Sequence, residues 1–184
     1  FVQDVAGAYE LLRRVVQALA LLDALLSLAE LAARPGYVRP VVHAPGNAPS
    51  DALALRGFRH PVTEALCDAY VPNDIVLGGS DAPRAVLLTG SNMGGKSSAV
   101  RAIALVVVLA QMGAFVPCIA AELTCHDSIA TRMGAADDLV RGKSTFMLEA
   151  DETAHILRTT TPRSLVILDE FGRGTSTFDG VALA

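Results

Sequence analysis

The chain of 184 residues is long enough for one domain of ordinary size with an appendage, and it can bury a core of its own. Its formal net charge of −4 excludes a broad basic surface for nucleic acid on this chain, so we expect any DNA contact to lie elsewhere or to be small. Three cysteines without metal-ligand spacing favour reduced thiols over a disulfide framework or over a zinc site made by Cys118, Cys125 and His126.

Residues 1–33 have the composition and apolar spacing of one long amphipathic helix, which Pro35 and Gly36 end. Charged residues interrupt its apolar stretch, so we expect no membrane span. A proline-rich linker follows over residues 40–51. The helix pattern favours core packing, and a partner-binding lever is the functional alternative.

Two short strands are predicted next. Residues 53–56 form an alternating apolar run, and residues 69–77 form a second extended segment that ends before a turn at Gly78-Gly79-Ser80. An apolar run at residues 85–89 then predicts a buried strand.

A phosphate-binding loop follows that strand. Residues 90–97 fit the pattern G-x-x-x-x-G-K-[ST] without a gap, and residues 98–112 are rich in helix formers. Glycine lets the backbone approach phosphate oxygens, which the first N–H groups of the helix then bind. A chance glycine-rich turn is disfavoured because strand, loop and helix are all expected. The nucleotide-binding residues are predicted to be Gly90, Ser91, Asn92, Met93, Gly94, Gly95, Lys96, Ser97 and Ser98.

Three residues in or near the loop have specific expected roles. Lys96 is one of only two lysines among 15 basic residues, and its compact ammonium suits the outer phosphates better than a guanidinium would. The Ser97 hydroxyl is expected to ligate Mg²⁺. Tyr70 lies upstream of the loop, where it can stack on adenine or serve as an ordinary half-buried packing residue.

A second helix N-terminus is predicted near Ser144 and Thr145, either of which makes a natural N-cap for a helix through residues 150–159. This helix end can be a simple cap or a second place for a phosphate to dock. Segments between Glu122 and Gly134 are expected to be irregular or strand-like.

Residues 164–168 predict a buried parallel strand that delivers Asp169 and Glu170 at its C-terminal end. This is the Walker B arrangement, in which Asp169 would hold the Mg²⁺ shell and Glu170 would polarise the attacking water as the general base. The alternative, a strand that ends in a solvated acidic turn, is disfavoured by the phosphate-binding lysine upstream.

At these residues the chain resembles the ATPase domain of the MutS family of DNA mismatch-repair proteins. The resemblance is carried by the runs GSNMGGKS at 90–97, TRMGAADD at 131–138, STFMLE at 144–149 and LDEFGRGTSTFDG at 168–180, and more weakly by RHP at 59–61. Residues 70–74 and 39–42 look most like the mismatch-binding subunit of the MutSα type, which we favour. The loop and the TRMGAADD run look equally like the MutSβ-type counterpart.

The resemblance implies an α/β P-loop NTPase of the ABC-ATPase type, like MutS domain V, over residues 53–184. Residues 1–35 would then end a helical lever region, and residues 36–52 would link the two. In this family ATP and Mg²⁺ bind between two subunits, so Ser144 and Thr145 would serve as a signature for the partner's nucleotide, while Lys96 and Glu170 would be catalytic in their own site. The implied partners are mismatched DNA, a second MutS-homologue subunit and downstream repair factors. The implied location is the nucleus.

The sequence also departs from the family pattern. Ser91 replaces a usual proline, Ala130 a usual aromatic and Phe171 a smaller aliphatic residue. The family's switch histidine would lie beyond Ala184, and because the chain starts at Phe1 and stops inside an expected helix, we expect a fragment that is inactive alone. The sequence lacks the N-K-x-D motif of GTPases, the arginine-rich lid of nucleotide kinases and the L-S-G-G-Q signature of transporters. A non-hydrolysing interaction or structural module remains the alternative.

Overall fold

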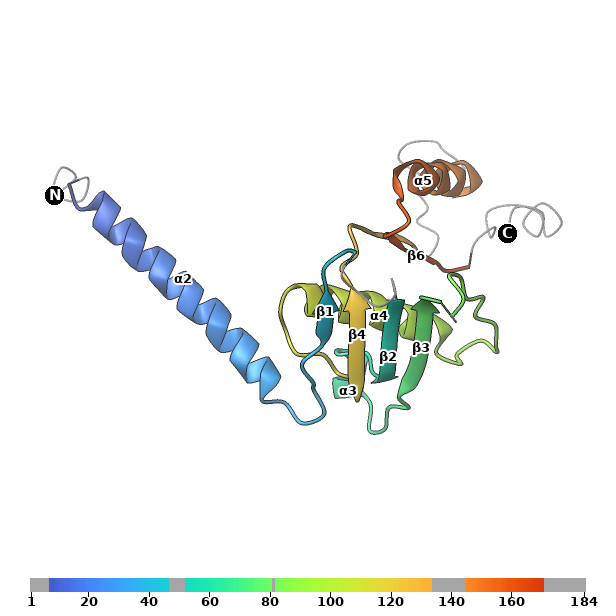
Figure 1. The fold of residues 1–184 in the computed structure, drawn as a ribbon, viewed down its shortest axis with the longest axis horizontal. Coiled ribbons are helices and arrows are strands. Elements are labelled where there is room, and N and C mark those ends of the chain that lie inside the picture. Colours follow the sequence, from blue (N-terminus) through green and yellow to red (C-terminus); the bar gives the residue numbers. More distant parts are fainter. Residues whose placement is uncertain (1–6, 47–51, 81, 134–144, 171–184) are drawn as a thin grey trace.

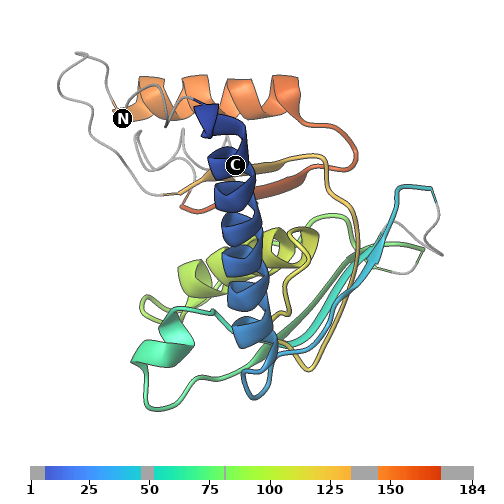
Figure 2. The same cartoon turned by 90° about the vertical axis from the view of Figure 1, so that its left-hand side faces the viewer.

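A computed structural model describes residues 7–46, 52–80, 82–133 and 145–170. The structure is mixed α/β (Figure 1). Seen from the side, a four-stranded sheet, a central helix, a pair of parallel strands and an outer helix follow one another as layers (Figure 2). A long N-terminal helix projects from these layers (Figure 1).

The four-stranded sheet has the order β1-β4-β2-β3 and is mostly antiparallel. Strand β1 (Val41–His43) runs parallel to β4 (Ala120–Thr124), and β2 (Ala52–Phe58) is antiparallel to both β4 and β3 (Asn73–Gly78). The strand expected at 53–56 is confirmed as part of β2. Of the extended segment expected at 69–77, residues 73–77 are confirmed as strand, and β3 continues to Gly78, where a turn was expected. Strand β1 was not expected, because it lies in the proline-rich stretch taken for a linker.

The central helix α4 (Lys96–Gln111) confirms the helix predicted after the glycine-rich loop. It packs between the large sheet and β6 (Leu165–Leu168). The apolar residues of the helix recur every three or four positions and those of the strands at every second position, so each element presents an apolar face to its neighbour. The core consists of Leu53, Leu55, Phe58, Ala102, Ile103, Val106, Val107, Ala110, Val116, Cys118, Ala121, Leu123, Leu165 and Ile167.

A Schellman motif ends α4. The N–H of Gly113 donates to Ala110 O (3.1 Å) and that of Ala114 to Leu109 O (3.0 Å), while Gly113 is left-handed at φ +85°. The chain then reaches Val116, whose backbone pairs in both directions with Val38 at 2.9 Å. The core helix is therefore joined directly to the segment that follows the N-terminal helix.

The parallel pair consists of β5 (Ile129–Arg132) and β6, with α5 (Thr145–Thr159) packed against it on the side away from α4 (Figure 2). Asp127 fixes the turn between α5 and β6. Its carboxylate accepts hydrogen bonds from the hydroxyls of Thr161 (2.5 Å) and Ser164 (3.0 Å) and lies 3.5 Å from Arg163. The hydrogen bond from Thr161 is the main cause that lowers the pKa of Asp127.

A polar cluster around Arg59 connects the linker to the short helix α3 (Thr63–Leu66). The Arg59 guanidinium donates to Glu64 (2.6 Å) and to Gly36 O (2.7 Å), and the hydroxyl of Tyr37 donates to the same carboxylate (2.9 Å). His60 Nδ1 accepts the N–H groups of Val62 and Thr63 at the start of α3. The RHP run thus has a local structural role.

Strand β2 bends at Gly57, which is left-handed at φ +54° and marks a register shift against β3. An added Cβ at this position would lie 2.5 Å from Cδ1 of Ile119. The Gly57 N–H donates to Asp74 Oδ1 at 2.6 Å, so the Asp74 carboxylate satisfies the backbone donor that the bend takes out of the strand pairing.

The N-terminal helix α2 (Tyr9–Ala32) confirms the predicted long helix, but none of its residues is buried. Its best 18-residue window has a mean hydropathy of 1.8, which is enough by length and composition for a membrane span, a test that core helices of soluble proteins also pass. The absence of a membrane partner stays a prediction.

The strand expected at residues 85–89 is wrong. The run has no strand assignment, and Leu87 is 91% exposed. An apolar run becomes a strand when a neighbour supplies backbone hydrogen bonds, and among the described residues no strand pairs with this one.

Candidate functional site

The glycine-rich loop closes a tight turn before α4. The N–H of Gly94 donates to Ser91 O at 3.2 Å, and Met93 takes a left-handed conformation at φ +64°. A Cβ on Gly94 would lie 3.0 Å from that same carbonyl oxygen, which is tighter than most Cβ contacts, so a side chain there would require the turn to shift by a few tenths of an ångström. The loop therefore favours glycine at position 94 for steric reasons.

Gly95 has a different task, because it turns the chain into the helix. It is the N-cap residue of α4 at φ +85°, and nothing lies within 4 Å of a methyl group added at its Cα. Its carbonyl accepts the N–H of Ala99 at 2.9 Å. The N–H groups of Lys96, Ser97 and Ser98 then have no acceptor within the helix, and the first turn carries no acidic residue that would repel an anion.

The Lys96 side chain folds back over the entrance of the loop. Its Nζ donates to the carbonyl oxygens of Gly90 and Ser91, both at 2.7 Å. The ammonium is therefore held beside the turn and the helix end. Residues 90–95 are all exposed and residues 96–98 are half-buried, so the loop itself faces open solvent.

The acidic pair lies where predicted, directly after β6. The N–H of Asp169 donates to Arg132 O at 2.9 Å, which extends the β5–β6 pairing by one bond. Asp169 is half-buried, whereas Glu170 is exposed and left-handed at φ +55°. The two adjacent residues thus differ in solvent exposure and in backbone conformation.

Other predicted residues are placed less fully. Tyr70 is half-buried three residues before β3. Ser144 lies outside the described residues, and Thr145 is the first residue of α5. Of the runs at 131–138 and 168–180, the described parts end at Met133 and Glu170.

The structure adds an ion-pair cluster that the sequence analysis missed. Arg132 Nη2 lies 3.8 Å from Glu149 Oε1, and Arg132 Nε lies 2.8 Å from Glu152 Oε2. The Nε contact is close but is not aligned as a hydrogen bond, so we treat it as an ion pair. The one available sequence signal was the three-residue spacing of two acids on one face of α5.

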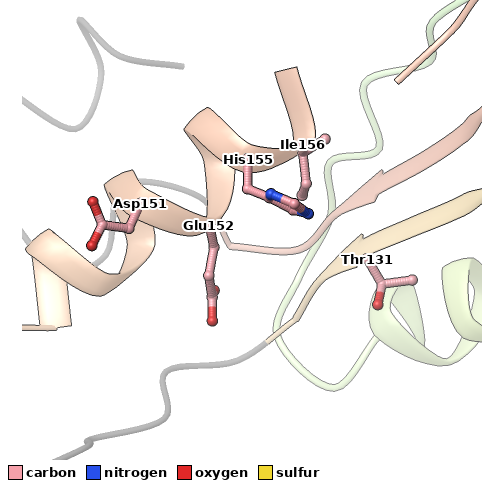
Figure 3. A pocket seen from close by; sticks show the side chains of 5 residues that line it. All are labelled: Thr131, Asp151, Glu152, His155 and Ile156. Atoms are coloured by element: carbon pink, nitrogen blue, oxygen red, sulfur yellow. The ribbon is translucent and has the colours of Figure 1, made fainter. Parts of the chain in front are cut away.

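A shallow hollow of about 360 Å³ lies beside this cluster, lined by Thr131, Asp151, Glu152, His155 and Ile156 (Figure 3). In that view Glu152 extends from α5 on the side of β5, whereas Asp151 points away. A second hollow of about 440 Å³ lies on the large sheet near Ala54 and Val76. Neither is lined by the loop or by the acidic pair.

The residues present fit a magnesium nucleotide better than a zinc ion. The Ser97 hydroxyl and the Asp169 carboxylate offer the oxygen ligands that Mg²⁺ prefers, and the helix end with Lys96 offers donors for phosphate. Burial raises the pKa of the Cys118 thiol to about 12, which opposes the thiolate that zinc requires. Among the residues that the structure describes, no three His, Cys, Asp or Glu side chains group as metal ligands.

Comparison with known proteins gives concordant matches. A family described as MutS domain V matches residues 86–184. Over 182 residues, the chain is 56% identical to the DNA mismatch repair protein MSH3 of Phaeosphaeria nodorum, 53% to that of Coccidioides immitis and 56% to that of Pyricularia oryzae. Each match covers 98% of this chain, α2 included, and the chain spans about 16% of the length of these relatives.

Proposed function

This chain belongs to the MutS family and contains its domain V, and from that premise we propose that it is the ATP-binding and ATP-hydrolysing part of a DNA mismatch-repair protein. In this proposal the domain has the P-loop fold of the ABC-ATPase type. ATP binding and hydrolysis would couple to mismatch binding and to formation of a sliding clamp by the whole protein.

The observation that carries the proposal is the loop ahead of α4. Three features lie together beside the Lys96 ammonium: a glycine at 94 with tight space around its Cα, a left-handed glycine at 95, and a helix N-terminus without acidic residues. Three backbone donors and one cation within a single turn of chain suit the phosphates of a nucleotide.

Each residue has a role that its position supports. Lys96 would exchange its two carbonyl partners for phosphate oxygens, Ser97 and Asp169 would hold Mg²⁺, and Glu170 would orient and deprotonate the attacking water. Bound Mg²⁺ supplies charge neutralisation on the phosphates. Tyr70 would stack on adenine.

The openness of the loop supports a composite site. Ligand pockets usually enclose most of a ligand, whereas residues 90–95 are exposed and line neither of the two hollows described above. We therefore propose that a second MutS-homologue subunit closes over the nucleotide, with Ser144 and Thr145 at the start of α5 serving the nucleotide of that partner.

The names of the relatives bear on the subfamily. Each is an MSH3 protein, which points to the MutSβ type, so our preference for the MutSα type is not supported. We propose a MutSβ-type subunit that acts in the nucleus with mismatched DNA, a second MutS homologue and downstream repair factors. The net charge of −4 agrees with DNA contacts lying outside this chain.

One observation favours the alternative of a non-hydrolysing interaction module. The run at residues 85–89 is exposed instead of forming the strand that usually supports a phosphate-binding loop. If this arrangement persists in the whole protein, the loop lacks its rigid base and the chain would be an interaction element.

The test compares full-length protein with its Lys96→Ala variant, each assembled with its partner subunit. ATP hydrolysis and release from a mismatched duplex are measured, with fully paired duplex as control. We expect the wild type to hydrolyse ATP and to leave the mismatch, and the variant to stay bound. Equal behaviour of the two proteins would reject the ATPase proposal in favour of the interaction module.

A further inference from the structure

We propose that Arg132 is a positioning residue that fixes the Asp169 end of one nucleotide site to α5, the helix that serves the nucleotide of the partner subunit. The inference rests on the proposed function, because only a composite site gives α5 a role in the second nucleotide. It assigns to Arg132 the coupling between the two sites of a dimer.

The backbone of Arg132 forms the first half of the link. Arg132 is the last residue of β5 and pairs in register with Leu168, the last residue of β6. Its carbonyl accepts the N–H of Asp169 at 2.9 Å. The position of the predicted magnesium-binding carboxylate is therefore set directly by the backbone of Arg132.

The side chain forms the second half. The Arg132 and Glu149 side chains are only 9% and 4% exposed, and the guanidinium lies between Glu149 and Glu152 of α5. These two acids are the fifth and eighth of the 15 residues of the helix, so they lie on one face of it, in its first half and at its middle. A planar guanidinium held by two carboxylates fixes direction as well as distance, which a lysine cannot do.

The opposite end of α5 has its own attachment. Thr161 and Ser164, just beyond the helix, are bound to Asp127, which precedes β5. The helix is thus tied to the strand pair at two places, by Asp127 beyond its C-terminus and by Arg132 between its first half and its middle. Loss of Arg132 would leave the C-terminal attachment in place and remove the ion pairs that orient the half of the helix leading to its N-terminal end, which serves the partner's nucleotide.

Buried ion pairs contribute specificity of arrangement more readily than stability. An apolar replacement of both partners often preserves stability, whereas removal of one partner leaves a buried charge uncompensated. This difference separates a positioning role of Arg132 from a purely structural one.

The experiment uses the full-length protein with its partner subunit and compares Arg132→Lys, Arg132→Met and the double variant Arg132→Met with Glu149→Leu. Melting temperature, ATP affinity and the kcat of ATP hydrolysis are measured for each. We expect Arg132→Met to be destabilised and the double variant to recover the wild-type melting temperature. We expect kcat to stay about tenfold to a hundredfold below the wild-type value in the double variant and in Arg132→Lys. ATP affinity should stay near that of the wild type, because misplaced catalytic groups slow the reaction more than they weaken binding.

Two controls separate the possible failures. Asp127→Asn loosens the same strand pair at its other end and should lower the melting temperature without changing kcat. Lys96→Ala tests the nucleotide site itself: if it hydrolyses ATP like wild type, the proposed function has failed. The inference on Arg132 is overturned by a different result, in which Lys96→Ala is inactive but Arg132→Lys has the wild-type kcat. A wild-type kcat in the double variant, once its melting temperature is restored, would overturn it equally, because Arg132 would then be only structural.

Discussion

Replacing Gly95 by alanine isolates what one left-handed backbone conformation contributes to nucleotide binding. No atom lies within 4 Å of the added methyl group, so the substitution carries a backbone cost without a steric one. That cost is about 1–2 kcal/mol for an alanine forced to a φ near +85°. A loop that relaxes to avoid it would no longer direct the N–H groups of Lys96, Ser97 and Ser98 toward one point.

The expected magnitudes follow from this cost. A loss of about 1–2 kcal/mol reduces the fraction of loops that are ready to bind by about 5- to 30-fold, and the dissociation constant for ATP should rise by the same factor. Each kcal/mol lost should lower the melting temperature of this domain's unfolding transition by about 2–4 °C, the range for a unit of this size. Both quantities can be measured on full-length protein by ATP titration and by thermal unfolding.

Gly113→Ala is the matched control. Gly113 also has a φ of +85° and also has open space around an added methyl group, but it lies at the other end of α4 in the Schellman motif. It should lower the melting temperature by a similar amount and leave ATP affinity unchanged. Equal losses of ATP affinity in the two variants, or none with Gly95→Ala, would refute the argument that this conformation prepares the phosphate site.

Three further outcomes are expected. Glu170→Gln in the intact protein should retain ATP binding and abolish turnover, as measured by trapping of labelled ATP, and loss of binding would reassign the residue to structure. Gly57→Ala should destabilise by about 1–2 kcal/mol in urea unfolding, because the exposed Ile119 can move aside while the φ of +54° remains, so adding Ile119→Ala should rescue little. The lowered pKa of Asp127, due mainly to its hydrogen bond from Thr161, stabilises the fold above the unfolded pKa near 4, and this contribution is lost as pH falls through the lower folded pKa. The stability difference between wild type and Asp127→Asn should therefore be constant above about pH 5 and shrink below about pH 4, and a difference independent of pH would contradict this.

The elements that sequence predicted best are those whose own residues determine them. The helix after the loop begins at a glycine and carries apolar residues at helical spacing, and β6 is a short apolar run that ends in two acids. Local pattern was sufficient for both. The turn of the loop was equally predictable, because its glycines and lysine interact with backbone atoms that are close to them in the sequence.

The predictions failed where a segment distant in the sequence determines the local structure. Val41–His43 is a strand because β4 lies beside it and pairs with it, although prolines are frequent in the residues around it. The run at 85–89 has a better strand sequence but lacks a pairing partner among the described residues. Arg132 and Glu149 meet only because β5 and α5 pack together, so the spacing of the two acids on α5 could not identify Arg132 as their partner.

The position of α4 between two sheets has a mechanical consequence. The helix is about 24 Å long, and core residues of the large sheet and of β6 pack against it on opposite sides, so a shift of its loop end is resisted by both layers. At its other end the chain turns through Gly113 to Val116, whose two hydrogen bonds hold Val38, shortly after the C-terminal end of α2. A displacement at the loop would therefore be passed along α4 to the base of the long helix, where a small change of angle moves the distant tip of α2 much further.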